Sequence, residues 1–173
     1  MYTIPRSSRR SGHLHWRTGA VAAIALLVCM VSLPRLENYV QSNNEEDAAV
    51  ALRVLGRAGD PGDAPDLATW IAGDRSLRHR FRDARRLEGS GLLMHHGYLF
   101  HMQRTGSGQT RFMAWPRSTP RTGRAAFLLD ATGGLHRHPN VDGHWSGPDA
   151  KPFGPGMVLA ERGWQSYAPA RRP

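Results

Sequence analysis

An apolar stretch near the amino end restricts the fold of this 173-residue chain more than any other feature. The segment 18–34 contains no charged residue, and Arg17 and Arg35 flank it directly. At 1.5 Å per helical residue, its 17 residues just cross a hydrocarbon core of about 30 Å when the helix stands nearly upright. The sequence beyond Pro34 is rich in helix formers and contains no glycine until Gly56. We therefore expect one long helix whose first half is a membrane anchor.

The charges around the anchor predict its orientation. Four arginines precede it, and only Arg35 follows it closely. Because positive residues gather on the cytoplasmic side, we expect the basic segment 1–17 in the cytoplasm and the rest of the protein outside the membrane. A cleavable signal peptide has similar basic and apolar parts, but it needs a small-x-small cleavage site, and residues 30–35 offer no convincing one. The sequence therefore predicts a retained, single-pass anchor in the cell membrane.

The residues after the anchor are enough for one domain with a modest core. We expect a globular domain over 35–138 and an extension rich in glycine and proline over 139–173. The chain has 23 Lys and Arg against 14 Asp and Glu, a net charge of +9. Most arginines alternate with acidic residues, so we expect no nucleic-acid partner. The one basic cluster, 75–86, is interpreted as the solvated face of a helix.

Two short helices are expected after the long one. Asp63 can cap a helix that ends at Gly73, and Asp74 can cap the next. In this second helix, four apolar residues recur at helical spacing: Leu77, Phe81, Ala84 and Leu87.

From residue 97 the pattern alternates with a period of two, which is typical of strands. Tyr98 and Phe100 fall on one face and Leu99 and His101 on the other, which predicts a half-buried strand. Further strands are expected at 110–116, 124–130 and 135–138, joined by turns that contain glycine. The sequence thus predicts an α+β fold in which an antiparallel meander of about four strands follows the helices. Irregular coil and a loose tail are expected over 139–173.

Two groups of short motifs resemble a known family. The first is the segment 44–53, in which an Asn-Glu pair precedes a Leu-Arg pair. The second is a series of sheet motifs: Gly97-Tyr98-Leu99-Phe100, Ala114-Trp115-Pro116, Thr122-Gly123 with Phe127, and Asp130-Ala131-Thr132-Gly133. Over residues 19 to 138 the chain resembles bacterial type IV pilins and pseudopilins. The resemblance implies a pilin-like domain on an anchoring helix, with envelope or secretion-system proteins as partners.

The residues that pilins use for polymerisation are absent. In prepilins the processed Gly precedes Phe, and a Glu occupies the fifth mature position. Here Ala20 follows Gly19, and Ile24 occupies the fifth position. Loss of this intramembrane carboxylate removes the pairing that registers neighbouring subunits. We therefore expect a pilin-like scaffold or interaction protein without fibre assembly, while cleavage at Gly19 stays open.

Histidines are the residues whose clustering suggests chemistry. The spacing of His136 and His138 on one strand can chelate zinc or copper, with Asp130 and Asp142 as possible oxygen ligands. An alternative function is therefore a periplasmic metal- or ligand-binding domain that uses the histidines of the sheet: His95, His96, His101, His136 and His138. Surface histidines without a metal are the competing interpretation.

Catalytic motifs do not emerge from the sequence. Its serines lie outside any Gly-x-Ser-x-Gly elbow, and the glycine-rich turns 89–91 and 106–108 do not lead into a helix with a Lys-Ser or Lys-Thr pair. The tryptophans and nearby aromatic residues could form a stacking platform, but we expect them in the core. We predict no enzyme and identify no cofactor or small-molecule substrate.

Overall fold

The computed structural model describes residues 12–152 and 163–168. The chain divides into two compact units, Met1–Asn38 and Tyr39–Pro173, and helix α1 (Gly12–Ala58) contributes residues to both. The helix begins before the predicted start at Thr18, so the end of the segment expected as a basic N-terminus is helical. The remainder of that segment, 1–11, lies outside the described residues.

In the first unit, α1 carries the apolar segment. Among the described residues it is the one helix long and apolar enough to cross a membrane, and none of its apolar window is buried. The large exposed side chains in this unit are Val21, Ile24, Leu26, Leu27, Val28, Met30, Leu33 and Leu36. Length and composition therefore support the predicted anchor.

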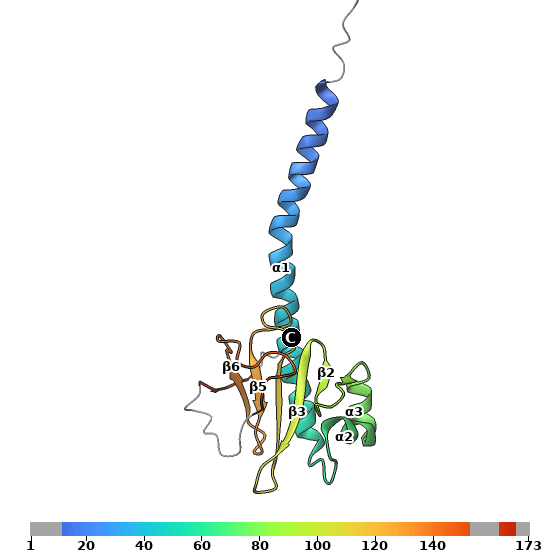
Figure 1. The fold of residues 1–173 in the computed structure, drawn as a ribbon, viewed down its shortest axis with the longest axis vertical. Coiled ribbons are helices and arrows are strands. Elements are labelled where there is room, and N and C mark those ends of the chain that lie inside the picture. The colour runs from blue at the N-terminus through green and yellow to red at the C-terminus, as the bar shows by residue number, and fades with distance from the viewer. Residues whose placement is uncertain (1–11, 153–162, 169–173) are drawn as a thin grey trace, which may run out of the picture. The chain divides into compact units, whose positions relative to one another are not determined.

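An antiparallel sheet forms the second unit (Figure 1). Within the described residues it has seven strands in chain order: β1 (Arg85–Arg86), β2 (Leu93–His95), β3 (Tyr98–Arg104), β4 (Thr110–Pro116), β5 (Ala126–Leu129), β6 (Leu135–His138) and β7 (Gln165–Ser166). The α+β class and the four central strands agree with the prediction. The prediction of about four strands was too low, because β1, β2 and β7 are too short to show an alternating pattern.

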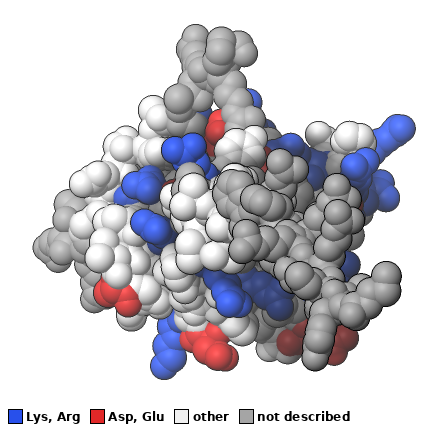
Figure 2. Space-filling model, turned by 90° about the horizontal axis from the view of Figure 1, so that it is seen from above, with Lys and Arg blue, Asp and Glu red and all other residues white. Residues whose placement is uncertain are grey.

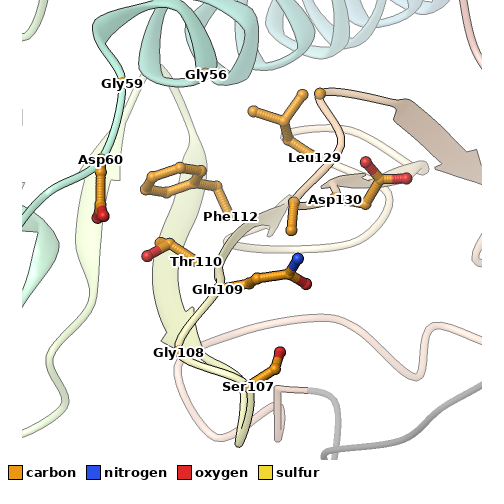
Figure 3. Close-up of a pocket in the computed structure, with 12 residues that line it drawn as sticks. Gly56, Gly59, Asp60, Ser107, Gly108, Gln109, Thr110, Phe112, Leu129 and Asp130 are labelled. Atoms are coloured by element: carbon orange, nitrogen blue, oxygen red, sulfur yellow. The ribbon is translucent and has the colours of Figure 1, made fainter.

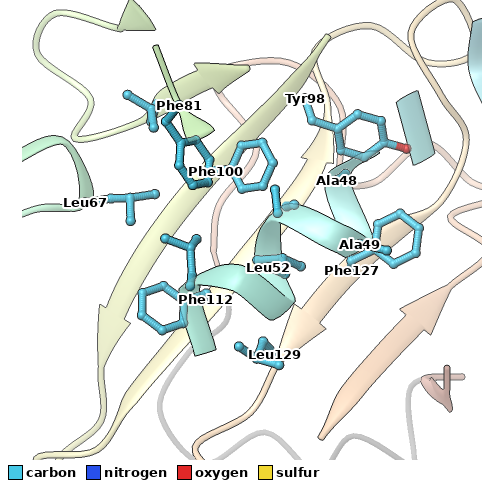
Figure 4. Packing of buried hydrophobic residues seen from close by; sticks show 14 of the residues in the cluster. Ala48, Ala49, Leu52, Leu67, Phe81, Tyr98, Phe100, Phe112, Phe127 and Leu129 are labelled. Atoms are coloured by element: carbon cyan, nitrogen blue, oxygen red, sulfur yellow. The ribbon is translucent and has the colours of Figure 1, made fainter. Parts of the chain in front are cut away.

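One face of this sheet packs against the C-terminal half of α1 (Figure 4). Leu52 and Leu55 are fully buried there, and small residues such as Ala48 let the helix lie close to the aromatic side chains of the strands. Each buried leucine or phenylalanine contributes about 1.5–3 kcal/mol. Two short helices, α2 (Leu67–Gly73) and α3 (Arg75–Arg80), add to the same core.

The caps of these short helices differ in part from those expected. Asp66, rather than Asp63, caps α2, and its carboxylate accepts a hydrogen bond from the Thr69 N–H at 2.8 Å. Asp74 caps α3 as predicted and accepts from the Leu77 N–H at 2.8 Å.

Helix α3 ends at Arg80, although helical spacing predicted a continuation to Leu87. Phe81 and Ala84 pack on the core beside α1, whereas Leu87 packs on the opposite face of the sheet. A helix with one apolar face cannot supply both cores. The chain therefore leaves the helix and forms β1 at the edge of the sheet.

The opposite face of the sheet is buried as well. Trp115 and its neighbours pack there with Trp145 and Trp164. The central strands therefore contribute side chains to a core on each face of the sheet, whereas the strand that begins near residue 97 was expected to be half-buried. Both covering tryptophans come from the extension 139–173, which also supplies β7. The loose tail expected at the end of the chain stays a prediction, because residues 169–173 lie outside the described residues.

A buried asparagine shapes the loop that covers this face. Asn140 is 1% exposed and adopts a positive φ of 49°. Its Nδ2 donates to the Trp145 carbonyl at 2.8 Å, and its Oδ1 accepts from the Trp145 N–H at 2.9 Å. Trp115 Nε1 donates to the Gly147 carbonyl at 2.8 Å. These bonds satisfy buried polar groups where no strand pairing is available.

Candidate functional site

Polar side chains on one turn of α1 bind the loop that leads into β5. Asn44 Nδ2 donates to the carbonyl oxygen of Thr122 at 2.9 Å. Glu45 Oε1 accepts from the backbone N–H groups of Arg124 and Ala125, at 2.9 and 3.1 Å. The carboxylate therefore satisfies two donors that precede the first paired residue of the strand.

The same turn also contacts two distant parts of the sheet. Glu45 Oε2 accepts from Arg137 Nη2 at 3.1 Å, and the Glu45 side chain is 17% exposed. Asp47 Oδ2 lies 3.1 Å from His96 Nδ1. We call Asn44, Glu45 and Asp47 the helix latch. The sequence singled out this segment for its resemblance to pilins but did not predict these contacts.

The sheet motifs that resemble pilins meet beside the latch. The Tyr98 hydroxyl donates to the Ala125 carbonyl at 2.9 Å. A Cβ at Gly123 would lie 2.2 Å from the Tyr98 hydroxyl oxygen, so only glycine fits there. Burial, together with the nearby Glu45 carboxylate, raises the pKa of Tyr98, and the hydroxyl remains a protonated donor.

A cavity of about 440 Å³ lies where α1 ends (Figure 3). Its wall combines the end of the helix with the β3–β4 and β5–β6 turns, and its apolar side consists of Phe112 and Leu129. Gly56 lets Leu129 approach the helix, because a Cβ there would lie 2.6 Å from Leu129 Cδ2. The polar groups of the wall are Asp60, Ser107, Gln109, Thr110 and Asp130.

The carboxylates of this cavity are already used by their own turns. Asp130 Oδ1 accepts from Thr132 N, Thr132 Oγ1 and Gly134 N, and its Oδ2 lies 2.8 Å from His136 Nε2. Burial raises the pKa of Asp130, but these hydrogen bonds outweigh it and lower the pKa below its ordinary value. Asp60 Oδ1 accepts from the Gly62 N–H at 3.1 Å. Both side chains therefore stabilise loops, and its lowered pKa makes Asp130 a weak acceptor for a substrate proton.

Within the described residues, the Ser107 hydroxyl beside the cavity has no base as a hydrogen-bond partner. Ser107 Oγ lies 2.8 Å from Thr105 Oγ1, which also donates to the Gln109 carbonyl. A nucleophilic serine needs a histidine or another base at hydrogen-bond distance. The hydrogen bonds of Thr105 instead hold the β3–β4 turn closed.

His95 is the last residue of β2, and His96 follows it in the turn to β3. His95 is 4% exposed, and its ring stacks on His96 with centroids 3.9 Å apart. Burial, together with the charges of His96 and Arg80, lowers the pKa of His95 to about 4. His95 is therefore a neutral part of the core near neutral pH, whereas His96 binds Asp47 of the latch.

The other three candidate histidines have separate surroundings. The ring of His101 lies 6.5 Å from Trp115, and burial lowers its pKa. His136 pairs with Asp130. His138 contacts the rings of Trp145 and Trp164, and its Nδ1 accepts from the Asn140 N–H at 2.9 Å.

The structure does not bring the five histidines into one site. His101 and His136 lie in one row of the sheet through Met113 and Leu128. Three strand spacings separate them, about 14 Å. Of the suggested oxygen ligands, Asp130 contacts His136, whereas Asp142 accepts from the His144 N–H in its own loop. Within 12–152 and 163–168, no three His, Cys, Asp or Glu side chains are placed to hold a metal ion.

Figure 2 draws the charged side chains on one face of the molecule. On the face drawn in Figure 2, Lys and Arg alternate with uncharged surface and with Asp and Glu.

Comparisons with family models, with curated proteins and with solved structures find no match for this chain.

Proposed function

We propose that this protein is a single-pass, membrane-anchored scaffold or interaction protein of the cell envelope, with a pilin-like domain outside the cytoplasm. It acts by presenting this domain at the membrane to other envelope or secretion-system proteins, and it catalyses no reaction.

The observation that carries the proposal is that the apolar side chains of α1 change from exposed to buried along the helix. The large apolar side chains from Val21 to Leu36 that are named above are exposed, whereas Ala48, Leu52 and Leu55 are buried against the sheet. An uncharged, exposed apolar helix is stable in lipid but costly in water. One continuous helix thus supplies both the membrane segment and part of the domain core.

The helix latch adds support. Asn44 and Glu45 connect the helix to the loop before β5, and Glu45 also connects it to β6. Such contacts resist displacement of the helix from the sheet, as a scaffold requires. The orientation follows from the arginines before the anchor. Fibre assembly is excluded from the proposal, because Ile24 occupies the position of the pilin glutamate.

Reporter fusions to the carboxyl end of the full-length chain test the proposal. An alkaline phosphatase fusion, active only outside the cytoplasm, should be active, and a fusion to green fluorescent protein, dark after Sec export, should not fluoresce. Both products should remain in the membrane after carbonate extraction. A fluorescent fusion, or a full-length product in the soluble fraction, would contradict the proposed topology.

A further inference from the structure

A groove between α2, α3 and the edge of the sheet combines an apolar floor with a basic rim. Its volume is about 370 Å³. The rim carries Arg78, Arg82 and Arg86. The floor is formed by Ala68, Ile71, Ala72, Phe81, Ala84 and Leu93. We call this feature the arginine groove.

The rim arginines retain hydrogen-bonding capacity for a ligand. Arg86 Nη2 lies 2.6 Å from Asp66 Oδ2, which occupies one of its five donors. Arg82 pairs with the adjacent Asp83 at 3.3 Å, but both side chains are mostly exposed, at 75% and 65%. Exposed pairs of this kind are weak and easily exchanged. Within the described residues, Arg78 forms no ion pair.

The surrounding surface adds to the positive charge. The segment 75–86 contains six arginines and a single acidic residue, Asp83. All six arginines are exposed. The groove therefore offers the apolar contact and the guanidinium groups that together recognise carboxylates beside apolar side chains.

We propose that the arginine groove docks an acidic segment of a partner protein, in which an apolar side chain enters the floor and flanking carboxylates pair with Arg78 and Arg82. This inference rests on the proposed function, because it supplies the contact through which the anchored domain would bind its partner. Charge complementarity determines the occupant: the floor takes a leucine or phenylalanine, and planar guanidinium groups bind carboxylates in fork geometry.

A membrane surface fits the groove less well than a protein segment. Asp66 and Asp83 lie beside the rim arginines, so a continuous layer of anionic headgroups would also face these carboxylates. A peptide can place its carboxylates at the arginines alone. The recessed floor also suits a single side chain rather than a flat layer of headgroups.

Peptide binding to the full chain in phosphatidylcholine nanodiscs tests the proposal. The probe is a fluorescein-labelled peptide with a Leu-Phe pair flanked by glutamates, followed by fluorescence anisotropy. We expect saturable binding that weakens about tenfold when glutamine replaces the glutamates, because charge-assisted hydrogen bonds are lost. Serine in place of the Leu-Phe pair should weaken it similarly, because the apolar contact is lost.

Variants of the chain locate the binding site. Arg78→Gln with Arg82→Gln should weaken binding about tenfold, whereas the control pair Arg57→Gln with Arg121→Gln, also exposed, should not. Ala72→Trp provides a second test, since it fills the floor and leaves every arginine in place. Tryptophan emission checks that each variant is folded.

Three results would overturn the proposal. The first is the absence of saturable peptide binding, and the second is an equal loss of peptide binding in the groove variants and the control variants. The third is that the arginine variants change only the binding of the chain to vesicles that contain phosphatidylglycerol. The last result would assign the groove to a membrane surface. The assay uses no topology reporter, so failure of the proposed orientation and failure of the groove are distinguishable.

Discussion

Glu45 on α1 and Arg137 on β6 form an ion pair at 3.1 Å, although 92 residues separate them in the sequence. The same carboxylate accepts two backbone hydrogen bonds from Arg124 and Ala125. A single helical residue thus connects the anchoring helix to two neighbouring strands of the sheet.

Replacement of Glu45 tests the latch. Glu45→Ala leaves the Arg124 and Ala125 N–H groups and the Arg137 guanidinium without their acceptor, and we expect the free energy of unfolding to fall by about 2 kcal/mol. Urea unfolding of the full chain in detergent micelles, followed by tryptophan fluorescence, measures the loss. The exposed Glu88→Ala is the matched control. Equal unfolding midpoints for both variants would contradict the role of Glu45.

The tryptophan cluster on the face of the sheet opposite α1 predicts that the extension 139–173 is part of the domain. Trp164 is 6% exposed and packs with Trp115 and Trp145. Trp164→Ala should therefore reduce the free energy of unfolding by about 3 kcal/mol, through lost burial and the cavity left behind. Val141→Ala, at a residue 90% exposed in the same extension, should have little effect. A stable Trp164→Ala protein would show that the extension is dispensable.

His95 predicts a loss of stability in weak acid. Its pKa is about 4 in the folded protein because of burial, against about 6.5 in an unfolded chain. Between these values the unfolded chain binds a proton that the folded one does not, so stability falls as the pH decreases from about 6.5 to 4. The contribution is on the order of 3 kcal/mol.

The variant His95→Phe should flatten this pH dependence, because phenylalanine fills the space beside Phe81 without titrating. The exposed His79→Ala serves as its control and should leave the slope unchanged. Urea unfolding at several pH values measures both. A slope that survives in His95→Phe would assign the acid sensitivity to other groups, such as His101.

Separation of the histidines predicts weak metal binding. Because no three candidate ligands are placed together in the described part of the chain, zinc and copper should be removed readily by dialysis. His136→Ala should leave the small retained amount unchanged. Elemental analysis of the full chain in detergent measures both. One retained metal ion per chain, lost in His136→Ala, would instead favour the metal-binding alternative.

The sequence predicted the helix and the central strands because their patterns are long. Tyr98 and Phe100 face α1, and Leu99 faces the opposite core, as their alternation indicated. The short strands β1, β2 and β7 were not predicted, because two or three residues show no alternating pattern. The sequence also did not predict that the second face of the sheet is buried. Trp145 and Trp164 lie in irregular segments, whose path depends on Asn140 and on contacts distant in sequence.

The candidate sites were predictable to a smaller extent. The segment 44–53 was identified only through its resemblance to pilins. The backbone groups that Glu45 binds lie about eighty residues away in the sequence, and no local pattern indicates them. The arginines of 75–86 were assigned to a solvated helix face. The groove arises only because the chain leaves α3 at Arg80 and folds back beside α2.

Processing at Gly19 gives a further prediction. Because Phe and Glu are absent from the positions that follow Gly19 in prepilins, the mature protein should retain the segment before it. Mass spectrometry of the protein from the membrane fraction should therefore identify a peptide that begins at Met1. A mature chain that begins at Ala20 would contradict this expectation.

Cysteine labelling tests the central claim of an anchored domain outside the cytoplasm most directly. The chain has one cysteine, Cys29, within the apolar segment. Val141→Cys adds a second at a highly exposed residue of the sheet domain. In intact spheroplasts, a membrane-impermeant maleimide should label Val141→Cys and leave the unmodified chain unlabelled. Labelling of Val141→Cys only after lysis, or of Cys29 in intact spheroplasts, would contradict the account.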